Sequence, residues 1–259
     1  MAEPVETTVN VGGVDVTVLR GGTGKPLLML HDELGYPGWM PWNDELAKNY
    51  EFIIPLQPAY GKTPKVDWIM SYRDLGGFYA QMLRAMNVSG AVGMGFSGGA
   101  FAAAEMLAAD PDVFSKVVLT GPMGLRPTEG EITDFLALTI RTHLRATVAN
   151  WETPLFGKIY GGEMTPEQFE MFEDARTETS RIGWEPFMFN PSLPHLLGGI
   201  TTPTLLVWGT ADTYTPYGCI EAYRKAIPHA EVAEIEGAGH RPEIENTDKF
   251  VAAVTKFLG

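Results

Sequence analysis

Gly95-Phe96-Ser97-Gly98-Gly99 follows the pattern G-x-S-x-G, and its two flanks matter more than the pattern itself. Residues 91–94 before it form a short apolar run, typical of a buried strand. Residues 100–109 after it are rich in alanine, a strong helix former, and end at an Asp-Pro pair. The segment therefore predicts a strand, a sharp turn with serine at its apex, and a helix, the arrangement called a nucleophile elbow.

Such a turn would favour Ser97 as a nucleophile. Its hydroxyl would stand clear of the backbone, near the free N–H groups and the positive dipole end of the following helix. The backbone N–H of Gly98 would point to where an oxyanion forms. The alternative is a glycine-rich turn that carries a serine without chemical use, because short motifs recur by chance.

A serine hydroxyl needs a base, and the base needs an acid that orients it. His240 lies in a loop of small residues, 236–242, after a predicted strand at 230–235. Asp212 follows another predicted strand, 203–208. An aspartate in such a loop is often only a turn former or a helix cap. The sequence nevertheless provides an acid and a base, each after a strand.

The chain order Ser97, Asp212, His240 resembles that of α/β-hydrolases, in the branch that includes esterases, haloperoxidases and C–C hydrolases. The resemblance covers nearly the whole chain, including the segment 190–209 that leads to the acid and the loop 237–240 that carries the histidine. It implies an α/β-hydrolase fold with a Ser97, Asp212, His240 triad and no cofactor.

The segment His31-Asp32-Glu33-Leu34-Gly35 departs from the family pattern, which has glycine where Asp32 stands. The resemblance makes the backbone N–H of Glu33 the second oxyanion donor beside that of Gly98. Acidic side chains near an oxyanion would oppose catalysis unless they point away. We expect Asp32 to turn outward or to cap the loop. Glu33 could instead face the substrate or position water, and His31 is expected to be structural.

Bulk properties limit the function classes. The chain has 259 residues, 20% of them charged, and a formal net charge of -13. These values predict one globular α/β domain and disfavour nucleic acid or an anionic membrane as partner. They also suggest a substrate that is not strongly anionic, unless a local basic patch overrides the net charge. The single Cys219 excludes an intrachain disulfide, and no metal site is expected. Oligomerisation is possible but not indicated.

The first six residues lack the basic and apolar regions of a signal peptide, and no run approaches the length of a membrane span. A cytoplasmic enzyme with a small-molecule substrate is therefore the default expectation.

Strands and helices alternate after an initial hairpin, which predicts a mostly parallel sheet with helices on both faces. Residues 1–124 and 200–259 would form this core. About 75 residues separate two consecutive strands, so 125–199 is predicted to be a helical cap, with helices at 131–149 and 166–179. The core strands are expected at 7–11, 14–19, 27–30, 52–55, 91–94, 116–120, 204–208 and 231–235, and the core helices at 42–48, 72–86, 100–109, 217–226 and 247–258.

Candidate substrate-binding residues come from the cap and from the surroundings of the serine: Asp32, Trp39, Phe96, His143 and Trp184. Packing is the alternative role for the aromatic residues and for His143. A minority of the cap aromatics is expected to line an apolar pocket for a medium-sized substrate.

The expected mechanism is ester hydrolysis through an acyl-enzyme on Ser97, the least demanding reaction of such a triad. A C–C hydrolase acting on a vinylogous diketone would use much the same residues. Lyases, haloperoxidases and dioxygenases of this fold stay open, because fold does not decide among them. A hydrolase-like ligand receptor with little turnover is a further alternative.

Overall fold

An antiparallel hairpin of β1 (Val5–Val11) and β2 (Val14–Gly22) begins the sheet in the computed structural model, which describes residues 4–259. The eight strands lie in the order β1-β2-β4-β3-β5-β6-β7-β8. Only β1–β2 and β2–β4 are antiparallel pairs, so the predicted mostly parallel sheet is confirmed. The remaining strands are β3 (Lys25–Leu30), β4 (Tyr50–Pro55), β5 (Ala91–Phe96), β6 (Phe114–Thr120), β7 (Thr204–Gly209) and β8 (Glu231–Ile235).

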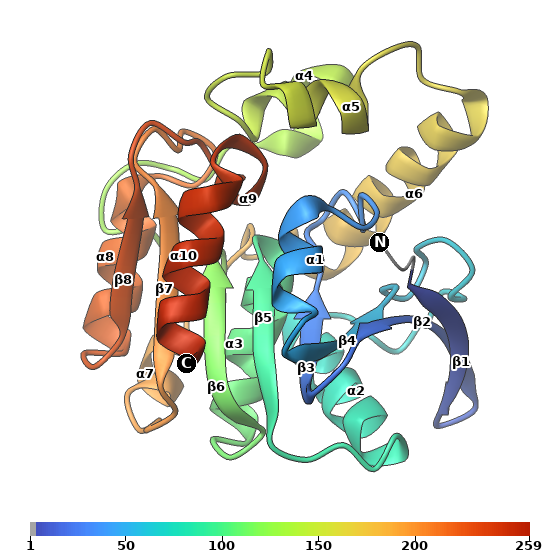
Figure 1. The fold of residues 1–259 in the computed structure, drawn as a ribbon, viewed down its shortest axis with the longest axis vertical. Helices are drawn as coiled ribbons and strands as arrows, with labels where there is room; N and C mark the ends of the chain where they lie inside the picture. Colours follow the sequence, from blue (N-terminus) through green and yellow to red (C-terminus); the bar gives the residue numbers. More distant parts are fainter. Residues whose placement is uncertain (1–3) are drawn as a thin grey trace.

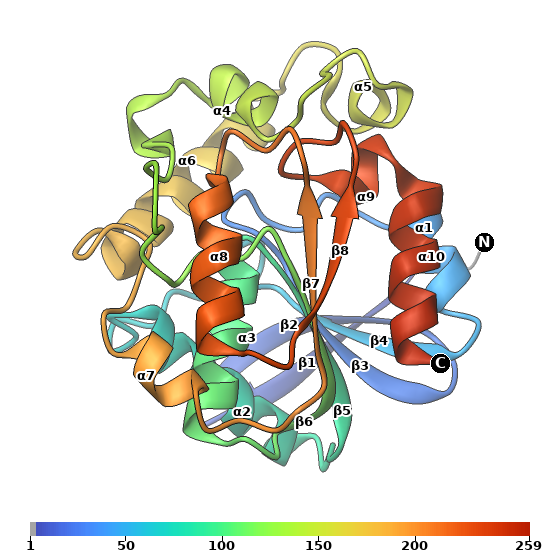
Figure 2. The same cartoon turned by 90° about the vertical axis from the view of Figure 1, so that its left-hand side faces the viewer.

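Helices cover both faces of the sheet, as Figures 1 and 2 show. α1 (Pro41–Leu46) packs with α10 (Thr247–Leu258) on one face. The other face carries α2 (Tyr72–Ala85), α3 (Gly98–Ala109), α7 (Leu193–Leu197) and α8 (Tyr217–Ala226). A short α9 (Pro242–Glu245) precedes α10. Within residues 4–259, no helix has both the length and the apolar character that crossing a membrane requires.

The sheet separates two apolar cores. On β7, Leu206 and Trp208 belong to the core on the α3 and α8 side, whereas Leu205 and Val207 belong to the core on the α1 and α10 side. Side chains alternate along a strand, so a strand buried on both faces needs apolar residues at every position. This explains why the parallel strands read as continuous apolar runs in the sequence.

Glycines on β5 and at the start of α3 allow this helix to lie close to the sheet. A Cβ built at Gly95 would fall 2.5 Å from the Cα of Ala100, and one at Gly99 would fall 2.3 Å from the carbonyl oxygen of His31. These separations are far below van der Waals contact, so side chains at both positions would push the helix away. The elbow is therefore tight because the glycines leave no atoms between helix and strands.

The insertion between β6 and β7 lies over the carboxyl ends of the strands (Figure 1). It contains the 3-10 helix η1 (Phe135–Ala137), α4 (Ile140–Ala146), α5 (Pro154–Tyr160) and α6 (Pro166–Gly183). Its two ends meet where Gly124 N–H donates to Met188 O and Asn190 N–H donates to Gly124 O. α7, also inside the segment 125–199 predicted as the cap, packs against α3 and α8 of the core.

The helix expected at 131–149 is wrong as a single element. Leu138 is extended between η1 and α4. The Asp134 carboxylate accepts the first N–H groups of η1, and the Thr139 hydroxyl accepts the N–H of Thr142 at the start of α4. Short polar side chains that cap a new helix compete with continuation of the old one, which accounts for the break.

The helix expected at 166–179 is confirmed and continues to Gly183, whereas α5, α7 and α9 were not expected. The predicted core strands and helices are all present, with ends that differ by a few residues.

The close approach of α3 predicts that Gly95→Ala destabilises the protein by about 1–3 kcal/mol or prevents folding, because the added methyl overlaps Ala100. Gly77→Ala in α2 is the matched control, since nothing lies within 4 Å of the place its methyl would occupy. That change should be neutral or stabilise by up to about 1 kcal/mol. Urea denaturation of both variants measures the difference, and equal effects would contradict the packing explanation.

Candidate active site

Ser97 lies between the end of β5 and the start of α3, the place that the sequence predicts. Its φ is +52°, a value that non-glycine residues rarely adopt and that costs on the order of 1–3 kcal/mol. Its N–H donates to the Thr120 carbonyl on β6 at 2.9 Å, which holds the turn. The Ser97 hydroxyl is buried and has no hydrogen-bond partner among residues 4–259. The strained backbone of Ser97 therefore goes together with a hydroxyl that forms no hydrogen bond to any of these residues.

Asp212 follows β7 and is held by a turn of its own. Its Oδ1 accepts the N–H groups of Tyr214 (2.8 Å) and Thr215 (3.0 Å), and its Oδ2 accepts the Thr215 hydroxyl (2.8 Å). Oδ2 also lies 2.8 Å from His240 Nδ1. Because a carboxylate beside an imidazole favours the Nδ1–H tautomer, His240 Nε2 is left as a proton acceptor. Nε2 has no partner within the described chain.

His240 lies over the turn that follows β6. A Cβ at Gly121 would fall 2.8 Å from His240 Cε1, and Gly121 directly follows Thr120, the residue that holds Ser97. Burial would lower the pKa of His240, but the charge of Asp212 and its hydrogen bond hold that pKa above its ordinary value. The structure thus brings the three predicted triad residues to one edge of the sheet.

His31 is neutral and structural, as the sequence analysis expected. Its Nδ1–H donates to the Asp32 carbonyl at 2.7 Å, and its Nε2 accepts the N–H of Gln57 at 3.1 Å. Burial lowers the pKa of His31 to about 4. Both ring nitrogens are therefore used to fix the loop after β3.

Glu33 occupies the expected oxyanion hole, which is a correction to the sequence-based expectation of two free N–H donors. Its Oε2 accepts the N–H of Gly98 at 3.3 Å, and its Oε1 accepts the hydroxyl of Tyr214 at 2.5 Å. His143 of α4 donates its Nε2–H to the Tyr214 oxygen at 2.7 Å. The side chain of Glu33 therefore points at the elbow, not away from it.

Asp32 does not turn outward. Its Oδ1 caps the loop by accepting the Leu34 N–H at 3.0 Å, and its Oδ2 forms a buried ion pair with Arg241. The same guanidinium lies 3.4 Å from Glu243 and donates to the hydroxyl of Tyr160 on α5. The buried carboxylate of Asp32 is thus compensated by a cation that directly follows His240.

Sequence reasoning missed Arg241, Tyr160, Tyr214 and Glu243. The signal that could have pointed to Arg241 was the acidic pair Asp32-Glu33, because buried carboxylates need a counter-charge. Nothing in the sequence indicates which tyrosines turn toward the triad.

The other predicted substrate-binding residues are dispersed. Phe96 packs against Trp42 and Phe250 in the core, and the Trp39 indole N–H donates to Asp44. Trp184 is 57% exposed and lines an open groove with Phe187 and Phe189. His143 is fully buried; its Nε2 bonds to the Tyr214 hydroxyl and lies 3.9 Å from Glu33 Oε1. Phe96 directly precedes Ser97, but its ring packs into the core, and the described partners of the Trp39 and Trp184 side chains include Asp44 and Phe187, not triad residues.

The loop of His240 is joined to the end of α4. Arg241 N–H donates to the Thr147 carbonyl at 3.1 Å. The Glu245 carboxylate accepts the N–H of Gly239 (2.6 Å) and that of Asn150 (2.8 Å), so it bridges the two segments. The insertion and the candidate base are therefore mechanically linked.

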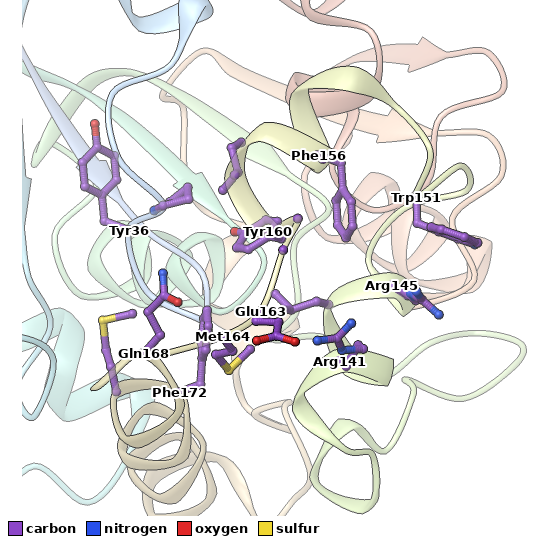
Figure 3. A pocket seen from close by; sticks show the side chains of 17 residues that line it. Tyr36, Arg141, Arg145, Trp151, Phe156, Tyr160, Glu163, Met164, Gln168 and Phe172 are labelled. Carbon is purple, nitrogen blue, oxygen red and sulfur yellow. The ribbon is translucent and has the colours of Figure 1, made fainter. Parts of the chain in front are cut away.

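A cavity of about 380 Å³ lies between α4, α5, α6 and the loop at Tyr36 (Figure 3). Aliphatic, aromatic and methionine side chains form most of its wall, and Arg141, Arg145 and Glu163 add two cations and one anion. Neither arginine forms a salt bridge within residues 4–259, although Arg145 stacks on Trp151 at 4.2 Å. Ser97 is not among the lining residues, but Tyr160 lines the cavity and contacts Arg241.

No group of three or more His, Cys, Asp or Glu side chains suited to a metal ion occurs in the described chain. The chemistry that the arrangement offers is a serine, a base with its orienting acid, and an additional carboxylate at the elbow.

Known proteins share this arrangement of sheet and helices. The model of the alpha/beta hydrolase family matches residues 27–253. The 2-hydroxy-6-oxononadienedioate/2-hydroxy-6-oxononatrienedioate hydrolase of Cupriavidus pinatubonensis is 25% identical over 97% of this chain and 94% of its own length.

Two solved structures are also similar. The 2-hydroxy-6-oxo-6-phenylhexa-2,4-dienoate hydrolase of Rhodococcus sp. strain RHA1 has a TM-score of 0.80 at 19% identity, over 100% of this chain and 99% of its own. A thermophilic esterase of Thermogutta terrifontis has a TM-score of 0.75 at 19% identity, over 99% of this chain and 98% of its own. At these identities, the structural matches establish the fold alone.

The buried cluster of Asp32, Arg241 and Glu243 predicts that the stability of the protein depends on pH. Burial raises the pKa of Glu243 to about 7, above the ordinary value of 4.5. A carboxyl with a raised pKa stabilises the fold when protonated, so this contribution is complete below pH 4.5 and is lost as the pH rises through 7. The free energy of unfolding of the wild type should therefore fall relative to that of Glu243→Gln between about pH 5 and 8, by on the order of a few kcal/mol. Urea denaturation at both pH values tests this, with exposed Glu170→Gln as control. Parallel pH profiles for wild type and Glu243→Gln would refute it.

Proposed function

The chain belongs to the alpha/beta hydrolase family, and on that premise we propose that it hydrolyses the carbon–carbon bond beside a ketone in a small unsaturated oxo acid. The reaction would proceed through an acyl-enzyme on Ser97, with His240 as base and Asp212 as the residue that orients it. No cofactor takes part in this reaction.

The observation that carries the proposal is the Asp212–His240 hydrogen bond of 2.8 Å, with Nε2 of the histidine left unpaired. An imidazole held in this tautomer can accept a proton from a neighbouring hydroxyl. The proposed donor is Ser97 Oγ, which is also buried and unpaired within the described residues. Two unsatisfied buried polar atoms are costly for stability, so their presence together favours a chemical role.

In the proposed first half-reaction, His240 Nε2 takes the Ser97 proton while Oγ bonds to the ketone carbon. The oxyanion that forms requires the N–H of Gly98, from which the Glu33 carboxylate must withdraw. Collapse of the oxyanion breaks the C–C bond. This step requires the vinylogous diketone form of the substrate, in which the enol proton has moved to the leaving carbon. The electron pair then leaves as a dienolate that the conjugated oxo acid delocalises, and His240 returns the proton to that dienolate.

In the second half-reaction, His240 takes a proton from water, and the hydroxide adds to the acyl carbon. Collapse of this intermediate releases a carboxylic acid, and Ser97 regains its proton from His240. Asp212 stays ionised throughout and stabilises the imidazolium.

The cap cavity supports an acidic substrate. Arg141 and Arg145 line it without forming a salt bridge among residues 4–259, and they outnumber Glu163, the acidic residue of the wall. The relative from Cupriavidus pinatubonensis carries a dioate in its name. Two cations beside aromatic walls suit a conjugated carboxylate. They would form the local basic patch that overrides the net charge of -13 for a substrate entering from this side.

Ester hydrolysis is the second candidate. The fold is shared with the esterase of Thermogutta terrifontis, and the same triad steps would cleave an ester with an alcohol as leaving group. The two functions differ in the bond that breaks, so product identification separates them.

We expect the wild-type protein to release succinate from 2-hydroxy-6-oxonona-2,4-dienedioate or benzoate from 2-hydroxy-6-oxo-6-phenylhexa-2,4-dienoate. Ser97→Ala should lower this rate by at least about a thousandfold, because the nucleophile is lost. Chromatographic quantification of the released acid gives the rate. Ser115→Ala, which removes an exposed serine hydroxyl on β6, is the matched control and should retain full activity. Turnover of aryl esters that depends on Ser97, without either acid product, would instead establish the esterase.

We further expect Arg141→Ala and Arg145→Ala each to raise KM for the dioate by about tenfold, since a lost charge-assisted contact is worth about 1.4 kcal/mol or more. KM for a neutral aryl ester should change little. Steady-state kinetics with both substrates measure this, and Lys158→Ala on α5 is the control for a cap cation outside the cavity. An equal rise in KM for both substrates would contradict the role in charge recognition.

A further inference from the structure

The carboxylate of Glu33 holds the position that an oxyanion needs. Its Oε2 lies 3.3 Å from Gly98 N, the first backbone nitrogen after the nucleophile, and the side chain is almost completely buried. A Cβ at Gly98 would fall 3.4 Å from the same Oε2, so the carboxylate rests directly against the elbow.

Several groups hold Glu33 in place. The Tyr214 hydroxyl donates to Oε1, and His143 supports Tyr214 from α4. The Tyr60 hydroxyl, which also contacts Thr179 on α6, donates to the Glu33 carbonyl at 3.0 Å. The position of Glu33 is thus fixed by the core and by two helices of the insertion.

Glu33 is ionised in this setting. Burial would raise the pKa of its carboxyl, but hydrogen bonding and the charges of His143 and His240, with the Tyr214 hydroxyl, hold it well below the ordinary range. A second negative charge on the substrate oxygen at the same N–H would be repelled strongly, because Glu33 is almost completely buried and its charge is little screened.

Moving Glu33 off the Gly98 N–H leaves a buried carboxylate oxygen without a donor. Leaving this charged oxygen of Glu33 without a hydrogen bond costs free energy. A substrate that carries a hydrogen-bond donor at the right place removes this cost, and a substrate without such a donor does not. Sites that depend on such a donor discriminate strongly against analogues that lack it.

We propose that Glu33 makes the site selective for carbonyl compounds that carry a hydroxyl on the carbon next to the reacting carbonyl or on the one beyond. The inference rests on the second candidate of the proposed function, ester hydrolysis through an acyl-enzyme on Ser97, because the oxo acids named above carry no hydroxyl on either of these carbons. In the productive complex, the carbonyl oxygen takes the N–H of Gly98, and the substrate hydroxyl donates to the displaced Glu33 oxygen. A hydroxyl at this spacing lies within hydrogen-bond range of the carbonyl oxygen, so a small shift of Glu33 is sufficient. Glu33 is then a specificity-determining residue.

The test compares phenyl lactate with phenyl propionate, two esters that differ in one hydroxyl on the acyl chain. Turnover is measured as kcat/KM and divided by the rate of hydrolysis in buffer, which corrects for intrinsic reactivity. The wild type should prefer the lactate ester by about a hundredfold or more. Glu33→Ala should reduce that preference to less than about threefold, mainly because turnover of the propionate ester rises.

Glu33→Gln keeps an oxygen acceptor for Gly98 without the charge, so its preference should lie between those two values. It also preserves the shape of the side chain and guards against misfolding of the alanine variant. Glu105→Gln is the matched control, because Glu105 is equally buried on α3 but bonds to Asn190. It should leave the wild-type preference unchanged.

Equal turnover of both esters by the wild type, or an equal loss for both in Glu33→Ala, would overturn the selectivity role. Absence of lactate ester turnover by the wild type would overturn it too. If turnover of both esters is equal and is abolished by Ser97→Ala, only this inference fails. Turnover that survives Ser97→Ala would contradict the proposed function itself, and the inference with it.

Discussion

The contact between α3 and the strands beneath it is the constraint on which the rest of the site depends. Gly95 and Gly99 carry no side chain, so the helix rests almost on the backbone of β5 and of the loop after β3. That contact forces the left-handed conformation of Ser97 and brings the start of α3 beside Glu33. The same packing therefore creates both the uncommitted hydroxyl of the elbow and the unusual acid against it.

The site concentrates charged side chains that are almost completely buried. Asp32, Glu33, Asp212 and Glu243 are carboxyl groups around the single base His240, and Arg241 is the cation that offsets them. Buried ion pairs contribute little to net stability, because desolvation offsets their attraction. The cluster is better understood as a device that sets the charge of His240 and fixes the loop after β3 than as a source of folding energy.

The fold could be predicted from sequence because it left local signals, and so could the placing of Ser97, Asp212 and His240 at one edge of the sheet. Apolar runs marked the strands, and each of these three residues follows one of them. The break in the helix at Leu138 was missed because it depends on the side chains of Asp134 and Thr139, which cap η1 and α4. Whether such a side chain caps a new helix or lies within a continuous one depends on competing hydrogen bonds to the backbone. The contact of Glu33 with Gly98 was missed because the two residues are 65 positions apart in the chain. It depends on the side-chain conformation of Glu33, which no sequence motif indicates. Arg241 was missed for the same reason, since its partner Asp32 lies 209 positions away.

The bridge from Glu245 to Gly239 and Asn150 gives the insertion two unequal halves. At the α4 end, the backbone of the insertion is bonded to the loop of His240, so any change of length there would shift the base. The α5–α6 end forms most of the wall of the cap cavity, to which α4 adds Arg141, Leu144 and Arg145. During divergence of such proteins, insertions and deletions should accumulate at the α5–α6 end and be purged at the α4 end. The cavity would thus change in size through the α5–α6 side, whereas the α4 side would change by substitution alone.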